Sequence, residues 1–185
     1  MKITDIYYFS GTHWDREWYQ TFQGFRARLV RMIDDLLDYM EKEPKFETFH
    51  FDGQTIVLED YIQIAPENEQ RLKKLIADGR IKIGPWYNMP DEFLVSGESL
   101  IRNLAVGAKL CKKWGAEPWK VGYICDIFGH IAQTPQIFSG FGIKSAVLGR
   151  GTNEEYPTYF DWTAPDGSSC TTFKLDAEGG YGSFF

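Results

Sequence analysis

The sequence predicts an α/β fold in which the strands of a parallel sheet alternate with helices. Five short runs rich in apolar and β-favouring residues lie at positions 3–9, 46–51, 81–86, 121–125 and 145–148, with segments of helical periodicity between them. This alternation is typical of parallel sheets joined by right-handed crossovers. The length of 185 residues and the 43% apolar content allow a sizeable core and exclude a mainly disordered chain.

The helices are indicated by apolar residues spaced along one helical face. They are expected at about 25–43, 56–64, 66–78, 99–114 and 135–141. Pro44 follows the first helix as a stop signal, and three aspartates occupy its polar face. Gly79 and Gly115 follow two of the others and suit left-handed C-terminal caps.

The pattern changes after residue 151. Residues 159–163 and 170–175 are expected to form a hairpin around a turn at 165–168, which has the sequence Pro-Asp-Gly-Ser. The last residues, 178–185, read as a functional loop interrupted in its course. We therefore expect the chain to be a fragment of a longer protein.

Charge and cysteine content narrow the class of partner. The net charge is −6 and no basic tract stands out, so neither nucleic acid nor an anionic membrane is an expected partner. We find no signal peptide and no apolar run near the ~20 residues that a spanning helix needs. Three widely spaced cysteines fit reduced thiols, which predicts a cytoplasmic protein.

Side chains with possible chemistry follow each predicted strand. In parallel α/β folds ligands bind at the carboxyl ends of the strands, so these positions should lie near one another. They are, in chain order, His13 with Asp15, then Asp52, then Trp86 with Asp91, then Asp126, and finally Arg150.

His13 and Asp15 are two residues apart, so in an extended segment they project to the same side. An imidazole nitrogen and a carboxylate oxygen are both zinc ligands. Asp126 ends an apolar strand and is placed to reach the same ion. The alternatives are that Asp15 and Asp126 cap the segments that follow them and that His13 packs in the core.

The other two histidines are expected to be structural. His130 follows Asp126 closely and is more simply a hydrogen-bonding residue than a ligand. His50 alternates with two phenylalanines in the second strand and reads as a packed histidine. Arg150 closes the fifth strand and is either a partner for a carboxylate such as Asp126 or a clamp for a hydroxyl or anion.

Aromatic residues gather at the same predicted edge: Trp14, Trp18, Tyr19, Trp86, Tyr87 and Phe128. Aromatic faces beside carboxylates suit sugar rings, because the C–H face of a sugar is apolar and its hydroxyl groups need acceptors. Core packing is the alternative for each of them.

Five motifs carry a family resemblance: HWDREWY (13–19), FDGQTIVLEDY (51–61), GPWYNMPDE (84–92), CDIFGH (125–130) and VLGRG (147–151). Together and in this order they resemble the catalytic domain of family 38 glycoside hydrolases, the retaining α-mannosidases, in its bacterial cytosolic branch. The resemblance implies that residues 1–185 are the N-terminal part of that domain. The fold that it implies is part of a seven-stranded (β/α) barrel-like glycosidase domain.

The resemblance also implies roles for single residues. A zinc ion would be held by His13, Asp15 and Asp126, and Asp126 would also be the nucleophile. Trp18 would stack on the bound mannose, with Phe128 and Arg150 at pocket positions. Trp86 and Asp91, which follow the third strand, complete the expected substrate-binding set.

The family has two further site residues, a zinc-binding histidine and an acid/base aspartate, which the resemblance places beyond residue 185. We therefore expect the 185-residue chain alone to be inactive. The expected substrate is a mannose-containing oligosaccharide, and a homo-oligomer would form through regions absent here. Two other classes remain open: a zinc amidohydrolase or deacetylase acting on a carbohydrate, and a non-catalytic sugar-binding domain.

Overall fold

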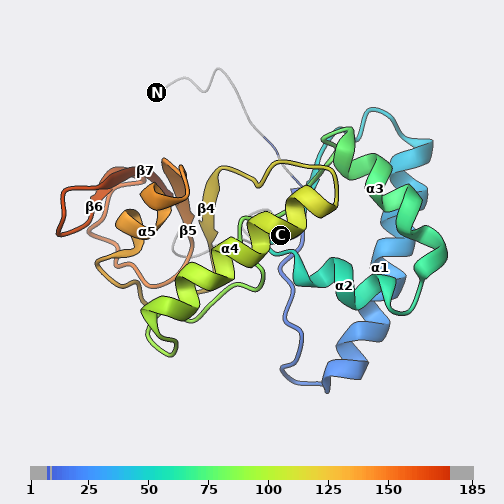
Figure 1. The fold of residues 1–185 in the computed structure, drawn as a ribbon, viewed down its shortest axis with the longest axis horizontal. Helices are drawn as coiled ribbons and strands as arrows, with labels where there is room; N and C mark the ends of the chain where they lie inside the picture. The colour runs from blue at the N-terminus through green and yellow to red at the C-terminus, as the bar shows by residue number, and fades with distance from the viewer. Residues whose placement is uncertain (1–7, 9, 176–185) are drawn as a thin grey trace.

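The computed structural model describes Tyr8 and residues 10–175. The elements, in chain order, are β1 (Ser10–Gly11), α1 (Phe22–Lys42), β2 (Phe49–His50), α2 (Ile56–Ile62), the 3₁₀ helix η1 (Pro66–Asn68), α3 (Glu69–Ala77), β3 (Ile81–Lys82), α4 (Gly97–Lys113), β4 (Val121–Ile124), α5 (Thr134–Gly140), β5 (Ser145–Leu148), β6 (Tyr159–Thr163) and β7 (Ser169–Lys174). Helices α1 to α3 gather at one end of the molecule and strands β4 to β7 at the other (Figure 1). Apart from Tyr8, the strand expected at 3–9 lies outside the described residues, as does the loop at 178–185.

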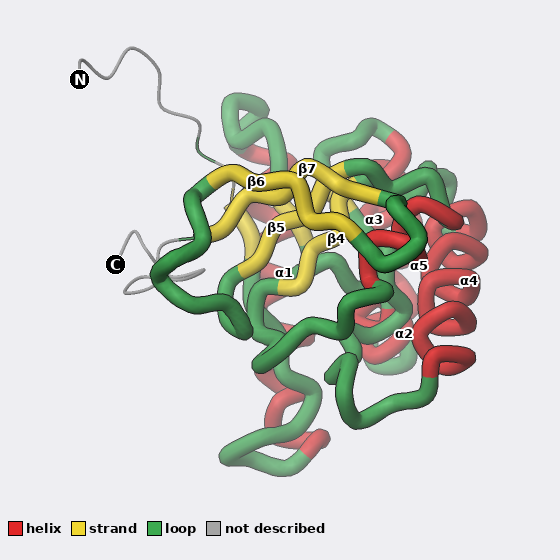
Figure 2. Tube along the Cα trace, turned by 90° about the vertical axis from the view of Figure 1, so that its left-hand side faces the viewer, coloured by secondary structure: helices red, strands yellow, loops and turns green. Residues whose placement is uncertain are grey.

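The strands form two sheets, and the α/β class with parallel pairing is confirmed. The first has the order β1-β2-β3 and is parallel throughout. The second has the order β4-β5-β7-β6, in which only β6 runs antiparallel, against β7. Figure 2 shows α4 and α5 together on one side of this second sheet.

Strands β2 and β3 end earlier than the sequence predicts, and positive φ angles follow both of them. Asp52 and Gly53 have φ values of 51° and 69°, which turn the chain soon after β2. Gly84 has a φ of 72° and does the same after β3. An isolated parallel bridge between Gln54 and Trp86 continues the pairing beyond these turns.

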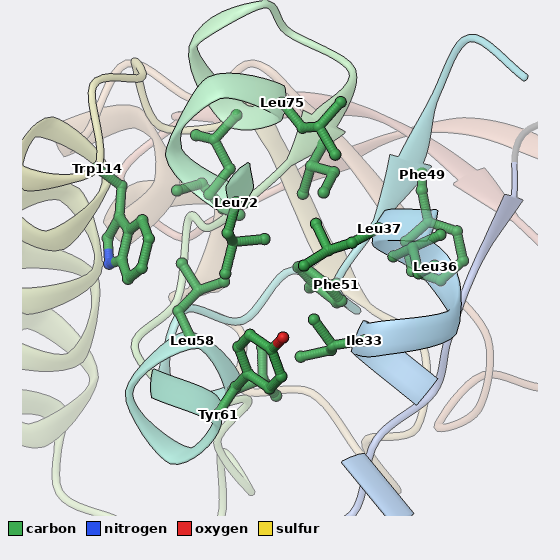
Figure 3. Packing of buried hydrophobic residues seen from close by; sticks show 14 of the residues in the cluster. Ile33, Leu36, Leu37, Phe49, Phe51, Leu58, Tyr61, Leu72, Leu75 and Trp114 are labelled. Atoms are coloured by element: carbon green, nitrogen blue, oxygen red, sulfur yellow. The ribbon is translucent and has the colours of Figure 1, made fainter. Parts of the chain in front are cut away.

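Helix α1 carries the apolar face that the sequence predicts. It starts three residues earlier than expected because the Thr21 side chain accepts a hydrogen bond from the Gly24 amide at 3.3 Å, which caps the first turn. Leu29, Ile33 and Leu37 on its inner face are fully buried. They meet side chains from α2, α3 and β2 in one apolar core, which Figure 3 shows around Phe51, Leu58 and Leu72.

A second apolar core lies under the other sheet. Phe138 of α5 packs there with Ile124 of β4 and with Ala146 and Leu148 of β5. Gly122 in β4 leaves the space that Phe138 fills, since a Cβ there would lie 2.2 Å from the phenylalanine ring. This packing fixes the ends of β4 and β5, from which Asp126 and Arg150 follow.

Helix α4 supports the loop that follows β3. It begins at Gly97, capped by Ser96, whose side chain accepts from the Ser99 amide at 3.2 Å. A Cβ at Gly107 would lie 2.1 Å from the Pro85 carbonyl oxygen, so only glycine lets the helix lie against this loop. The Asn103 side chain then accepts from the Tyr87 amide at 2.8 Å.

The expected hairpin is present as β6 and β7. In its turn the Asp166 side chain accepts from the Ser168 amide at 2.9 Å, and Gly167 has a φ of 87°. Strand β7 also pairs in parallel with β5, which places the hairpin at the edge of the second sheet.

All three cysteines are free and buried. Within the described residues no helix is both long enough and apolar enough to cross a membrane.

Candidate functional site

A cavity of about 590 Å³ lies beyond the ends of the parallel strands. The segments after β1, β2, β3 and β4 all contribute to its lining, which consists of His13, Trp14, Asp15, Arg16, Glu17, Phe22, Gln54, Asn88, Met89, Asp91, Asp126, Ile127 and Phe128. Four carboxylates are among these residues, so the cavity is acidic.

His13, Asp15 and Asp126 converge in this cavity. His13 Nε2 lies 3.1 Å from Asp126 Oδ2 and 3.5 Å from Asp15 Oδ2. One ligand atom from each of the three side chains lies within 4.8 Å of the others, and an imidazole with two carboxylates is a donor set that divalent metals accept. The structure therefore brings together the three residues in which the sequence predicts a metal site.

Asp52 lies behind His13 and fixes its orientation. Asp52 Oδ2 is 2.9 Å from His13 Nδ1 and also accepts from the Trp14 amide and the Gln54 side chain, each at 3.1 Å. Because a carboxylate only accepts, Nδ1 carries the proton and Nε2 is left to face the carboxylates. A histidine held in this way is the usual arrangement behind a metal, so the residues present fit a bound ion.

Charge and burial act in opposite directions on this group. Burial disfavours the charged form of His13, but the hydrogen bond with Asp52 and the negative charges of Asp52, Asp15 and Asp126 outweigh burial and raise the pKa of His13. Burial of the Asp52 carboxyl raises its own pKa, although the donors around it oppose that shift. The group holds more negative charge than its own residues offset, which favours a cation.

Arg150 contacts the carboxylate oxygen of Asp126 that does not face His13. Its Nε lies 2.9 Å from Asp126 Oδ1, and its guanidinium lies 5.6 Å from the centre of the Phe128 ring. The carboxylate partner that the sequence allowed for Arg150 is thus Asp126. The two oxygens of Asp126 are divided between His13 and Arg150.

The loop that carries His13 and Asp15 is anchored to α2. Arg16 donates two hydrogen bonds to the Asp60 carboxylate, at 2.7 and 2.9 Å. This bidentate pair occupies Arg16, the only arginine or lysine among the cavity-lining residues of the described chain.

The expected substrate-binding residues divide into three groups. Phe128 and Asp91 line the cavity, and Arg150 reaches its edge through Asp126. Trp18 is 74% exposed and stands outside the lining, against Tyr19. The expectation for Trp86 is corrected: it is 1% exposed and packs in the second core, where its indole N–H donates to the Tyr123 carbonyl.

The side chains of the two other histidines are buried outside the cluster of His13, Asp15 and Asp126. His50 is buried between Trp119 and Tyr123, and burial lowers its pKa to about 4. His130 bridges Glu92 and the Arg150 carbonyl, at 2.8 and 2.9 Å.

Sequence reasoning missed the supporting roles of Asp52, Gln54 and Glu92. Asp52 was placed at a strand end, but its hydrogen bond to His13 follows from the pairing of β1 with β2, which aligns Gly11 with His50. The sequence signal that could have drawn attention to Asp52 is the Asp-Gly pair directly after an apolar strand. In the structure Asp52 has a positive φ, a conformation that often marks a functional site when the residue is not glycine.

Comparisons with known proteins agree with one another. The sequence profile of the glycosyl hydrolases family 38 N-terminal domain matches residues 4–181. A candidate mannosylglycerate hydrolase of Halalkalibacterium halodurans is 45% identical over 172 residues, which are 86% of this chain and 19% of that protein. An α-mannosidase of Saccharomyces cerevisiae is 25% identical over 176 residues, 92% of this chain and 16% of that protein.

Solved structures give the same result. The crystal structure of an α-mannosidase from Enterococcus faecalis V583 superposes with a TM-score of 0.86 at 39% identity and covers 91% of this chain and 20% of that chain. A 4-α-glucanotransferase from Thermococcus litoralis has a TM-score of 0.59 at 18% identity over 78% of this chain and 24% of its own, which shows likeness of fold alone. The chain thus spans about a fifth of the length of these relatives.

Proposed function

Because the chain belongs to glycosyl hydrolase family 38 as an N-terminal domain, we propose that it supplies the metal-binding and nucleophilic part of an α-mannosidase active site. The observation that carries the proposal is the meeting of His13, Asp15 and Asp126 in an acidic cavity at the strand ends. The substrate we propose is a terminal α-D-mannosyl group on an oligosaccharide.

The proposed metal is zinc, held by His13 Nε2 and one carboxylate oxygen each from Asp15 and Asp126. When bound, it would act as a Lewis acid and as a template that orients sugar hydroxyls. The three ligands of this chain would leave coordination positions for the further histidine that the family resemblance implies and for a substrate. Asp52 keeps His13 in the tautomer that this role needs.

Asp126 is the proposed nucleophile of a retaining reaction. Its carboxylate oxygen forms a bond to the anomeric carbon while the glycosidic C–O bond breaks and the leaving oxygen takes a proton from a general acid. Water then cleaves the glycosyl ester, restoring the carboxylate and giving mannose with the original configuration. Arg150 supports this role because its guanidinium holds Oδ1 in place.

The charges that line the cavity affect which leaving group the site would accept. Asp15, Glu17, Asp91 and Asp126 line it, while Arg16 is paired with Asp60. This described part of the pocket favours a neutral sugar as leaving group. The 45% identity to a protein named for mannosylglycerate favours an acidic one instead. Hydrolysis rates for an α-mannobiose and for mannosylglycerate, compared on the full-length protein, decide between them.

Trapping with a fluorinated mannosyl donor tests the proposal. We expect a covalent adduct on Asp126, found by mass spectrometry of its peptide, together with loss of activity. Turnover without an adduct would support attack by a metal-bound water, as in an amidohydrolase. Sugar binding without turnover would identify a non-catalytic binding domain. The cytoplasmic location and the oligomeric state stay predictions of the sequence.

A further inference from the structure

A second group of charged side chains lies beside the cavity and contributes no ligand to the metal cluster. Glu92 follows β3 and His130 follows β4, and their side chains are 1% and 6% exposed. Neither lines the cavity. Burial of two ionisable groups is costly unless they are paired and hydrogen-bonded, so this pair needs a physical explanation.

Hydrogen bonds surround the Glu92 carboxylate on both oxygens. Oε2 accepts from the Ile131 amide at 2.9 Å and from the Thr134 hydroxyl. Oε1 lies 2.8 Å from His130 Nδ1. On the other side of the ring, His130 Nε2 lies 2.9 Å from the Arg150 carbonyl oxygen.

These partners determine where the protons are. A carbonyl oxygen only accepts, so Nε2 of His130 carries a hydrogen. Glu92 Oε2 already accepts from two donors, which is the environment of an ionised carboxylate. With Glu92 ionised, Nδ1 would face an acceptor as well, so both ring nitrogens face acceptors and the contacts fit an imidazolium beside a carboxylate.

Through Arg150, His130 is connected to Asp126 in the cavity. Arg150 is held by its carbonyl to His130, by its amide to the Cys125 carbonyl at 3.0 Å, and by its guanidinium to Asp126 at 2.9 Å. All three partners lie in the segment that follows β4. Gly151 allows this close approach, because a Cβ there would lie 2.8 Å from His130 Nε2.

We propose that Glu92 and His130 form a buried ion pair that positions Arg150 against Asp126. His130 is thus a positioning residue: its charge-assisted hydrogen bond fixes the Arg150 backbone, and Arg150 in turn fixes the Asp126 carboxylate. The consequence for metal affinity rests on the proposed function, whereas the ion pair itself does not.

The first test reads the protonation state of His130 directly. In metal-free chain labelled with ¹⁵N-histidine, two-bond ¹H–¹⁵N spectra at pH 7 should show both ring nitrogens of His130 protonated. Only three histidines are present, so a His130→Gln variant assigns the signals. One unprotonated ring nitrogen in the folded chain would overturn the ion pair.

The second test separates charge from geometry with two substitutions at one position. In Glu92→Gln the amide oxygen still accepts from Ile131 and Thr134, and the amide N–H donates to a neutral His130. Glu92→Ala loses all of these bonds. We expect zinc affinity, measured against a chromophoric chelator, to fall about 10- to 100-fold in Glu92→Ala. Glu92→Gln should recover only part of this loss, because its neutral His130 still donates to the Arg150 carbonyl but without the charge, and its spectrum should show one bare nitrogen; full recovery would show that the charge plays no part.

The matched control is Tyr61→Phe, which removes a buried hydrogen bond of 2.6 Å to Asp34 in the other core. It should lower stability without changing zinc affinity. If Glu92→Ala binds zinc as tightly as the wild type, or Tyr61→Phe weakens binding equally, the positioning role is wrong. If the wild type binds no zinc, the proposed function fails, while the histidine spectrum still decides the ion pair.

Discussion

The two sheets supply the site with differently balanced charges. On the side of the first sheet, His13 faces Asp15 and Asp52, so two carboxylates surround one imidazole. Beside the second sheet, Asp126 faces Arg150, and Glu92, which follows β3 of the first sheet, reaches across to His130, so each of these carboxylates has a basic partner. We call these the His13 side and the Arg150 side. The unbalanced negative charge lies on the His13 side, which is where a divalent cation would compensate it.

Asp126 joins the two sides, and its replacement should have the largest effect. Asp126→Asn keeps an oxygen for Arg150 but removes the charge that binds metal and attacks the sugar. We expect kcat for an aryl α-mannoside on the full-length protein to fall by about 10⁴- to 10⁶-fold, as for other nucleophile losses. The thermal unfolding midpoint should stay near that of the wild type. Activity within tenfold of the wild type would remove Asp126 from the mechanism.

The pH response of His50 sharpens the comparison, because His50 lies among aromatic rings instead of carboxylates. Its pKa is lowered to about 4, so its neutral form contributes stability that is present above pH 6.5 and lost as the pH falls to 4. A His50→Phe variant should lack this loss, worth about 3 kcal/mol at pH 4.

Urea unfolding of the wild type and of His50→Phe at pH 7 and pH 4 measures how much stability each protein loses in acid. His13 has the opposite sign: its pKa is raised, so its charged form stabilises the metal-free chain below pH 6.5 and that contribution fades as the pH rises through the higher value. Equal acid sensitivity of the wild type and His50→Phe would refute the assigned role of burial.

Asp52 tests the unbalanced charge on the His13 side. Asp52→Asn keeps the shape of the side chain but removes the charge that fixes the His13 tautomer. Zinc affinity should fall about 10- to 100-fold. Since Asp52 has a φ of 51°, a conformation that asparagine also adopts, the fold should persist. Unchanged affinity in a folded variant would show that His13 needs no partner.

The smallest effect is expected far from both sides. Arg102 pairs with Glu98 on the surface of α4 at 2.7 Å, with side chains 76% and 65% exposed. Arg102→Ala should change the free energy of unfolding by less than about 0.5 kcal/mol and leave zinc affinity unchanged. A measurable change in zinc affinity would mean that charges far from the cavity also contribute to metal binding.

The proposed metal ligands could be predicted from the sequence more readily than the residues that hold them in place. Strand ends and the two-residue spacing, which survive small errors in strand length, made His13, Asp15 and Asp126 candidates, and the family resemblance implied their role as a metal-binding set. Trp86 differs from its expected place in the cavity because its side chain packs in the second core, a matter of tertiary packing that a strand-end position does not show. Asp52 and Glu92 act through partners 39 and 38 residues away, and such pairings depend on packing rather than on local pattern.

The central claim is tested most directly by anomalous diffraction from zinc-soaked crystals of this chain. We predict one strong peak at the zinc absorption edge, about 2.0–2.2 Å from His13 Nε2 and from carboxylate oxygens of Asp15 and Asp126. The same peak should be absent from crystals of His13→Ala. A peak elsewhere, or none at this place in well-ordered crystals, would contradict the account.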